Sequence, residues 1–238
     1  MPSRHRLTLL QSIANSGNSR AFAHKVRRKR QKIFESYFQE MLVNKPIKIL
    51  DVGGTFDFWK QMGYDKNTNV QILLLNLMAE QVDSENIRSI VGDACDLSQF
   101  CDKQFDIVFS NSVIEHVGNH QRQIVMAKEI LRVGKNYFVQ TPNYWFPFEP
   151  HFLIFGFQYL PVSMKAFLVQ KFNFGWLGRQ NDKKKALELA DSVHLLSKRR
   201  LKKLFPDSII VNEYFLGLTK SMILLNKQIV YVGKDRII

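Results

Sequence analysis

The residues with the clearest potential for chemistry form the run DVGGTFDF at 51–58, which follows an apolar segment. Gly53 and Gly54 let the backbone approach a ligand, because no Cβ stands in the way. A dinucleotide-binding turn needs G-x-G-x-x-G, and this run lacks the second and third glycines. The carboxylate of Asp57 would also repel a pyrophosphate, and no G-K-[ST] follows to make a P-loop. The run, which begins with Asp51, therefore favours a cofactor without phosphate over NAD or a nucleotide.

Further polar residues each follow an apolar run, as Asp51 does. Asn76 ends LLLN, Asp93 and Ala94 lie in GDACD, and Asn111 lies in FSNS between Ser110 and Ser112. A parallel sheet binds cofactors beyond the carboxyl ends of its strands. We therefore expect these residues to face the same site as the two glycines.

Three residues are candidates for a general base: Glu115, His116 and His151. A base is needed only if the atom that reacts carries a proton, as a hydroxyl oxygen does. His116 could instead anchor the following helix through a ring N–H bonded to the backbone. The Glu–His pair could bind a divalent metal only with a third ligand, and no spacing in the sequence predicts one. We therefore predict no metal site.

The elements that would position these residues are short apolar runs rich in Val and Ile. They lie at 47–52, 70–75, 87–91, 105–109 and 136–140. Such continuous runs are typical of parallel strands covered on both faces. Helices expected at 56–63 and 119–132 would make right-handed crossovers between strands.

The end of the chain predicts a different pairing. Residues 208–217 and 220–226 read as two strands joined by a short break at Leu218–Thr219, hence antiparallel. The sequence thus predicts an α/β fold with a mostly parallel sheet and an antiparallel last strand.

These blocks, taken together in this order, resemble the class I S-adenosylmethionine-dependent methyltransferases, especially the type 11 group. The resemblance covers about residues 46–143 and 208–226. It implies a Rossmann-like seven-stranded sheet with helices on both faces, and S-adenosylmethionine as cofactor. The glycines of the family's G-x-G-x-G fall at Gly53, Thr55 and Asp57. Because two of the three are replaced, we expect a turn that is tighter than usual or shifted outward.

The resemblance also implies roles for residues at the strand ends. Asn76 stands where the family usually has an acid that holds the ribose hydroxyls, and an amide can still hydrogen-bond them. Asp93 would accept a hydrogen bond from the adenine amine, and Ala94 would offer a backbone N–H. The cofactor-binding residues implied in this way are Asp51, Gly53, Gly54, Asn76, Asp93, Ala94 and Asn111.

The expected domains are a helical extension over residues 1–45 and a methyltransferase domain over 46–238, with an inserted lid or cap at 144–205. The extension carries ten Lys or Arg against two acids, and its apolar residues recur at helical spacing, so it predicts a helix with a basic face. Within the insertion, residues 144–180 hold twelve aromatics and a single acid, Glu149. This segment is either a hydrophobic cap on the sheet edge or a lid that contacts an apolar acceptor or a bilayer.

The net charge of +13 indicates an anionic partner. No apolar run reaches the roughly 18 residues of a membrane span, so we expect a cytoplasmic protein that can associate peripherally with an anionic membrane surface. RNA is less favoured, because no separate RNA-binding module is evident and TPNY differs from the N/D-P-P-Y motif of amino-group DNA methyltransferases.

The predicted function is methylation of a small-molecule, glycan or lipid-linked acceptor, with oxygen slightly preferred as the methylated atom. One alternative is an RNA methyltransferase. The other is a non-catalytic binding module that keeps the fold, which the missing glycines and Asn76 would favour.

Overall fold

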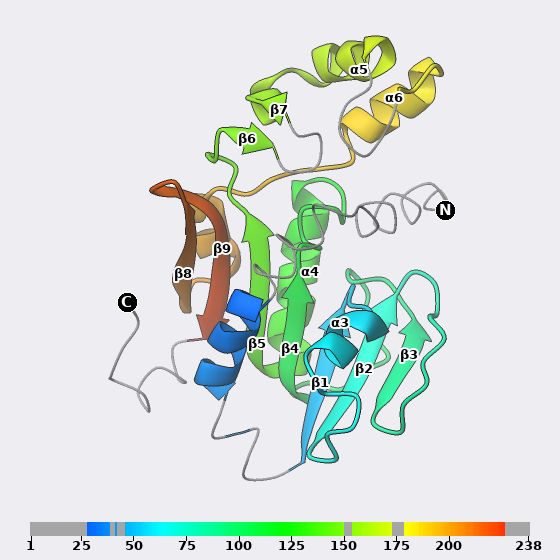
Figure 1. Cartoon of the computed structure of the whole chain (residues 1–238), viewed down its shortest axis with the longest axis vertical. Coiled ribbons are helices and arrows are strands. Elements are labelled where there is room, and N and C mark those ends of the chain that lie inside the picture. The colour runs from blue at the N-terminus through cyan, green and yellow to red at the C-terminus, as the bar shows by residue number, and fades with distance from the viewer. Residues whose placement is uncertain (1–27, 39–40, 42–45, 150–153, 173–178, 227–238) are drawn as a thin grey trace.

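The structure is a computed structural model that describes residues 28–38, 41, 46–149, 154–172 and 179–226. Its centre is a seven-stranded sheet in the order β3-β2-β1-β4-β5-β9-β8 (Figure 1). The strands are β1 Ile47–Val52, β2 Val70–Asn76, β3 Ile87–Val91, β4 Phe105–Asn111, β5 Gly134–Pro142, β8 Ser208–Phe215 and β9 Leu218–Asn226. β9 is antiparallel to both of its neighbours, and the pairings among β1 to β5 are parallel. The predicted fold class is confirmed.

The hairpin between β8 and β9 turns two residues earlier than the sequence predicted. Phe215 pairs with Leu218, so the two-residue turn is Leu216–Gly217 rather than Leu218–Thr219. Both turn residues have positive φ, 49° and 78°. A two-residue hairpin turn requires positive φ, which glycine adopts freely, so Gly217 decides where the chain reverses.

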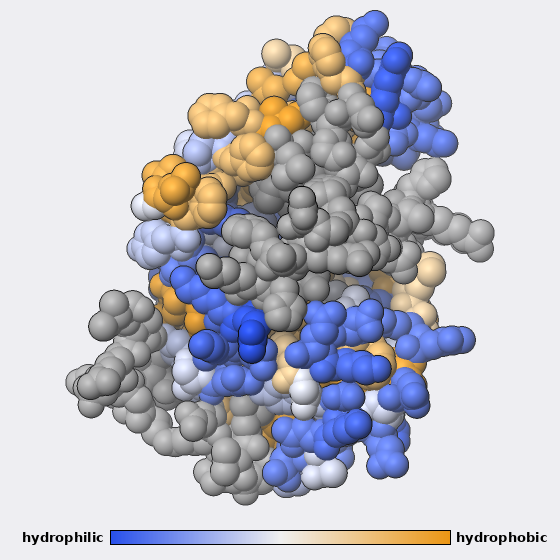
Figure 2. All heavy atoms as spheres, viewed as in Figure 1, coloured by the Kyte–Doolittle hydropathy of each residue, from blue (hydrophilic) through white to orange (hydrophobic). Residues whose placement is uncertain are grey.

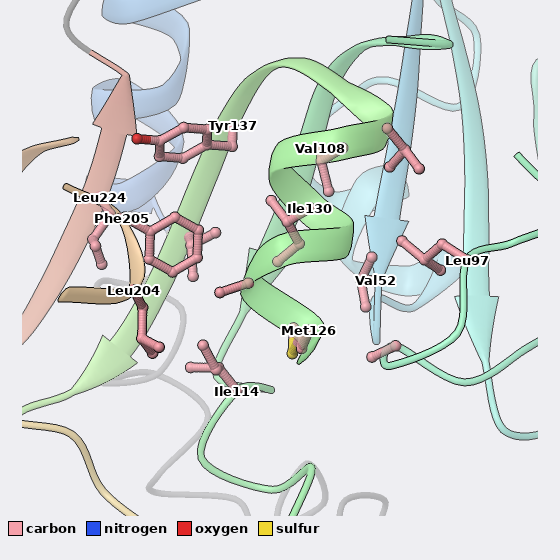
Figure 3. Close-up of a cluster of buried hydrophobic side chains, with 14 of the residues drawn as sticks. Val52, Leu97, Val108, Ile114, Met126, Ile130, Tyr137, Leu204, Phe205 and Leu224 are labelled. Atoms are coloured by element: carbon pink, nitrogen blue, oxygen red, sulfur yellow. The ribbon is translucent and has the colours of Figure 1, made fainter. Parts of the chain in front are cut away.

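One face of the sheet is covered by α4 (His120–Val133) and α7 (Lys198–Leu204) (Figure 3). Met126 and Ile130 of α4 pack on Val108 of β4, while Phe205 lies 5.3 Å from the ring of Tyr137. Asn119 caps the start of α4 by accepting a hydrogen bond from the backbone N–H of Arg122. Each fully buried large apolar side chain stabilises the fold by about 1.5–3 kcal/mol.

The other face is covered by α3 (Phe56–Gln61) and by the helix over residues 28–38. Phe34 and Phe38 of that helix are fully buried. They pack with Trp59 of α3 and with Phe109 and Phe138 of the sheet, whose rings stack at 4.9 Å. The predicted apolar stripe is therefore part of the core of the sheet domain, and helices lie on both faces as expected. The first 27 residues of the predicted extension lie outside the described residues.

The segment between β5 and β8 rises beyond the carboxyl edge of the sheet (Figure 1). It contains β6 (Phe148–Glu149), β7 (Ile154–Phe155), the short 3-10 turn η1 (Phe157–Tyr159), α5 (Val162–Lys171) and α6 (Lys183–Ala190) before it returns through α7. Its own small core joins Phe157 and Val169 to Ala186 and Leu189. α7, at the end of the predicted insertion, packs on the sheet instead, through Leu201 and its neighbours.

Candidate functional site

The site begins at a three-residue turn, 53–55, between β1 and α3. A Cβ on Gly53, which has φ +81°, would lie 2.4 Å from Cγ2 of Val113. A Cβ on Gly54 would lie 1.6 Å from Oδ2 of Asp51. Both positions thus exclude any side chain. Asp57 falls in the first turn of α3, not in the loop, which agrees with the tighter turn expected from the sequence.

Asp51 lies fully buried beneath this turn. Its Oδ2 accepts a hydrogen bond of 2.6 Å from Nε1 of Trp59, while Oδ1 has no hydrogen-bond partner among the described residues. Burial is the main cause that raises the pKa of Asp51 to about 7. The hydrogen bond from Trp59 lowers this pKa, and the nearby charge of Glu80 raises it. A carboxyl group that can hold a proton near neutral pH is therefore built into the floor of the turn.

Asn76 holds the turn from the end of β2. Its Nδ2 donates a hydrogen bond of 2.8 Å to the carbonyl oxygen of Gly54. The half-buried side chain keeps Oδ1 as an acceptor. The structure thus places Asn76 beside the glycine turn, as the sequence predicted, and adds a positioning contact that the sequence did not reveal.

Glu80 is a site residue that the sequence analysis missed. Its Oε2 accepts a hydrogen bond of 2.9 Å from the backbone N–H of Phe56, the first residue of α3. Thr55 Oγ1 accepts from the N–H of Phe58 in the same turn. The N–H groups that would bind a pyrophosphate are therefore engaged by the protein's own oxygens. The only sequence signal was an acid four residues beyond the end of β2.

Asp93 follows β3 and is already paired. Its carboxylate accepts hydrogen bonds of 2.7 and 2.9 Å from Nη2 of Arg122, and a third from the backbone N–H of Cys95. The hydrogen bond to Asp93 raises the pKa of Arg122. Ala94 beside it is buried. Arg122, on α4, is a second residue that sequence reasoning missed, because it lies 29 positions away in the chain.

The carboxyl end of β4 separates Ser110 from Asn111, which the sequence predicted to face the same site. Ser110 is fully buried, so that expectation is wrong for Ser110. Successive side chains of a strand point to opposite faces, and Ser110 shares the α4 face with Val108. Asn111 points the other way, where its Oδ1 accepts a hydrogen bond of 2.8 Å from Nη1 of Arg30.

Arg30 joins the N-terminal helix to the far side of the sheet. Its Nε lies 3.0 Å from Oε2 of Glu213 on β8, and the side chains are 12% and 8% exposed. Ser221 of β9 donates a hydrogen bond to the same carboxylate. This near-buried network brings residues from both ends of the sequence to the edge of the candidate site. No local sequence motif predicted it.

Ser112 turns the chain away from β4 with φ +58°, which is uncommon for a residue other than glycine. Gln140 of β5 holds it there. Ser112 donates from its backbone N–H to the carbonyl oxygen of Gln140 and from Oγ to Oε1 of the same residue. This fixed turn sets the path of the chain into the segment with Glu115 and His116.

The three predicted bases have different surroundings. Glu115 is fully buried, and its Oε2 accepts a hydrogen bond of 2.9 Å from Oγ1 of Thr141 at the end of β5. His116 keeps 12% of its side chain exposed, and its Nε2 lies 4.0 Å from Oε1 of Glu115. His151 lies outside the described residues. Of the two described candidates, His116 is the more accessible to a bound molecule.

The described residues also bear on a metal site and on a membrane span. No group of three or more His, Cys, Asp or Glu side chains there could hold a metal ion. In the same part of the chain, no helix combines the length and the apolar character needed to cross a membrane.

Comparison with known proteins gives a family match over the site. Residues 53–138 match the type 11 family described as "Methyltransferase domain". The matched residues run from the glycine turn into β5. A curated relative, an uncharacterized protein of Mycobacterium tuberculosis (strain CDC 1551 / Oshkosh), is 42% identical over 53 residues, or 22% of this chain. The match spans 18% of that relative's length.

Solved structures share the fold at low sequence identity. The 1,6-didemethyltoxoflavin-N1-methyltransferase of Burkholderia thailandensis, with bound 1,6-didemethyltoxoflavin and S-adenosylhomocysteine, is 10% identical with a TM-score of 0.55. That likeness covers 95% of this chain and 90% of the other. The CurJ carbon methyltransferase is 10% identical with a TM-score of 0.51, over 84% of this chain and 53% of that one. At these identities the likeness concerns the fold alone.

Proposed function

We propose that this chain, a class I S-adenosylmethionine-dependent methyltransferase of the type 11 group, methylates a small-molecule, glycan or lipid-linked acceptor, with oxygen preferred as the methylated atom. The proposal concerns the acceptor and the residues that serve it. By their names, the two solved structures with the same fold are an N1-methyltransferase and a carbon methyltransferase, so the fold leaves the methylated atom open.

The main support for the proposed cofactor is that backbone N–H groups at the start of α3 are already hydrogen-bonded within the protein. Glu80 accepts from the N–H of Phe56, and Thr55 caps the same turn, so a phosphate would meet a carboxylate there. A cofactor that brings hydroxyls, amines and an aromatic ring but no phosphate meets no such conflict. S-adenosylmethionine has this composition, and the close approach allowed by Gly53 and Gly54 suits it.

In this proposal each strand end holds one part of the cofactor. Asn76 Oδ1 accepts from the ribose hydroxyls, while its Nδ2 fixes the turn through Gly54. Asp93, oriented by Arg122, accepts from the adenine amine, and Ala94 offers its backbone N–H. The exposed Leu77 and Met78, 40% and 50% accessible, follow Asn76 and offer apolar surface for the adenine ring.

The chemistry needs little from the chain beyond positioning. When bound, S-adenosylmethionine supplies an activated methyl group, and the rate gain comes from holding the acceptor in line with it in a site without water. A hydroxyl acceptor must also lose a proton. His116 is the preferred base because it is accessible, and the buried Glu115 orients it from 4.0 Å. Glu115 is then a positioning residue. His151 remains a candidate from the sequence.

Calorimetry with S-adenosylmethionine tests the cofactor, and NADH is the matched negative ligand. We expect binding of the first and none of the second; the reverse result would contradict the proposal. His116→Ala should then abolish methylation of a hydroxyl acceptor while leaving cofactor affinity unchanged. Equal activity of the variant and the parent would remove His116 as the base.

Two alternative functions have their own tests. An RNA methyltransferase would shift RNA in a gel with strong salt dependence, which the basic helix over residues 28–38 and the lysines of α6 could support. A non-catalytic binding module would show no heat of binding with S-adenosylmethionine. The two glycines that the turn keeps, at which no side chain fits, and the polar residues at three strand ends favour the enzyme.

A further inference from the structure

An apolar surface lies along one margin of the end of the molecule beyond the carboxyl edge of the sheet (Figure 2). It is formed by exposed side chains of the insertion and of the tip of the β8–β9 hairpin, and we call it the apolar end. Its most exposed described members include Phe155, Met164, Phe167, Phe172, Leu216 and Leu218. An apolar area of this kind, concentrated at one end of a protein, marks a surface of interaction.

The hairpin tip gives the sharpest sign of an outside contact. Leu216 is 87% exposed and has φ +49° in the two-residue turn with Gly217. Such turns favour Asn or Gly, because a side chain with a Cβ at positive φ is strained. A leucine here is unfavourable both for its backbone conformation and for its exposure. It therefore serves something other than the stability of the free protein.

The outward face of α5 repeats this pattern. Met164, Phe167 and Lys171 lie at i, i+3 and i+7, so they share one face, and all three are exposed. The opposite face, with Ala166 and Val169, packs against α6. The ammonium of Lys171 lies 6.0 Å from the ring of Phe167. The outward face is thus apolar with a cation at its margin.

The insertion and the hairpin are physically joined. The rings of Phe146 and Phe215 lie 6.3 Å apart. The side chain and the backbone N–H of Asn143 donate to the carbonyl oxygens of Thr219 and Lys220. The two segments therefore present their exposed side chains as parts of one packed body, and Figure 2 shows them along the same edge of the molecule.

The two stretches that supply most of these exposed side chains carry positive charge only. Residues 154–172 and 214–220 contain no acid, and they include Lys165, Lys171 and Lys220. Three successive exposed lysines, 183–185, begin α6 beside this surface. A second copy would bring these lysines against one another in a chain of net charge +13. An anionic partner with an apolar interior fits both features.

We infer that the apolar end docks on an anionic lipid bilayer, with Leu216 and the exposed phenylalanines among the acyl chains and the lysines at the phosphates. The carboxyl edge of the sheet then lies toward the bilayer, and an acceptor held in the membrane reaches the methyl donor from that side. This role in methyl transfer rests on the proposed function, whereas the membrane contact does not. The acceptor class becomes a lipid or lipid-linked molecule.

The test is co-sedimentation of the full chain with phosphatidylcholine vesicles, with and without phosphatidylglycerol, at low and high salt. We expect binding only with the anionic lipid and a marked loss at high salt, since exposed charges are screened beyond about 10 Å at 0.1 M salt. Leu216→Asn should weaken binding about fivefold, and Phe155→Ser with Phe167→Ser about tenfold or more. Phe157 is unsuitable for this test, because it is 1% exposed and supports the insertion's core.

Two controls keep the test sharp. Asn-Gly is a favoured hairpin turn, so Leu216→Asn cannot act by damaging the turn. Val91→Ser removes a 62% exposed apolar side chain from β3, at the opposite edge of the sheet, and should leave vesicle binding unchanged.

The outcomes separate this inference from the proposed function. If the chain binds S-adenosylmethionine but no vesicles, the inferred membrane contact is wrong and the proposed methyltransferase function stands. A dimer in solution that Leu216→Asn dissociates, with no vesicle binding, also overturns it and assigns the surface to a second copy. If the chain binds vesicles but neither Leu216→Asn nor the double phenylalanine variant weakens that binding, the assignment of the membrane contact to the apolar end is wrong.

Discussion

The two halves of the sheet's carboxyl edge differ in the side chains that they present. Over β1 to β3, the polar side chains of the site are bonded by the protein itself: Asn76 to Gly54, Glu80 to Phe56, and Asp93 to Arg122. Beyond β5 and β9, the surface is made of exposed apolar side chains on the insertion and the hairpin tip.

Under the proposed function and the inferred membrane contact, the two halves bind partners of different chemistry. Hydrogen bonds to a small polar cofactor require donors and acceptors already held in place, because each group immobilised on binding weakens the affinity. An apolar surface needs no fixed angles, since the hydrophobic effect is non-directional. The fixed polar groups of the first half suit a single ligand, whereas the apolar half suits the lipid surface that we propose.

The largest expected effect is at the glycine turn. Gly54→Ala would place a Cβ 1.6 Å from Oδ2 of Asp51, so the buried carboxyl group must leave its bond with Trp59. We expect a loss of about 4–5 kcal/mol in the free energy of unfolding, measured with urea. Gly63→Ala is the control, because it has φ +78° but open space, and should lose only about 1 kcal/mol.

A double variant identifies the cause of that loss. In an Asp51→Ala background, Gly54→Ala should lose much less, because the carboxyl group with which it collides is gone. The same loss in both backgrounds would show that the turn, and not Asp51, excludes the methyl group.

The second effect concerns pH. The pKa of Asp51 in the folded protein is about 7, above the ordinary value of 3.8, so the folded state holds this proton more tightly than the unfolded chain. Its contribution to stability is therefore complete below pH 4 and is lost as pH rises through about 7, by at most about 4 kcal/mol. Asp51→Asn should remove this dependence, which urea unfolding from pH 4 to pH 8 would measure.

Asp96→Asn is the control for the pH experiment. Hydrogen bonds from Ser98 lower the pKa of Asp96, so this side chain loses its stabilising effect as pH falls, the opposite direction. If the parent and Asp51→Asn lose stability in parallel between pH 4 and pH 7, the raised pKa of Asp51 is wrong.

The third effect concerns the near-buried ion pair of Arg30 and Glu213. This pair is a polar contact on β8, in the half of the sheet whose edge is otherwise apolar. Arg30→Ala leaves Glu213 buried without this partner and also releases Asn111, so we expect a loss of about 3 kcal/mol in unfolding free energy. Lys135→Ala breaks the pair with Asp106, in which Lys135 is 52% exposed, and should lose less than about 1 kcal/mol. Equal losses would mean that the N-terminal helix is held by its phenylalanines alone.

The smallest effect separates two readings of Asp93. If its carboxylate contacts the cofactor, Asp93→Ala should weaken S-adenosylmethionine binding by about 2 kcal/mol in calorimetry. Arg122→Ala, which removes only the partner of a half-exposed pair, should weaken it by less than about 1 kcal/mol. The opposite ranking would assign the contact to Arg122 and reduce Asp93 to its support.

The sequence by itself determined the strands of the main sheet and their order along the chain. Continuous apolar runs identified the parallel strands, and the closing pair 208–217 and 220–226 predicted the antiparallel end, because burial on one or two faces leaves a periodic trace in the chain. It also placed Gly53, Asn76 and Asp93 at neighbouring strand ends, since each follows an apolar run directly. The replacement of a family glycine by Asp57 also predicted a tighter turn. In the structure Asp57 lies in the first turn of α3, where a glycine is not needed.

Tertiary structure alone decided which of those side chains are available. Ser110 faces the core because strand alternation, counted from the actual register, turns it inward. Arg122, Glu80 and Arg30 reach the site from 29, 24 and 81 residues away from their partners, and no local pattern encodes such distances. Packing also exposed Leu216 at the hairpin tip. Long-range contacts depend on how whole elements dock, so only the folded chain specifies them.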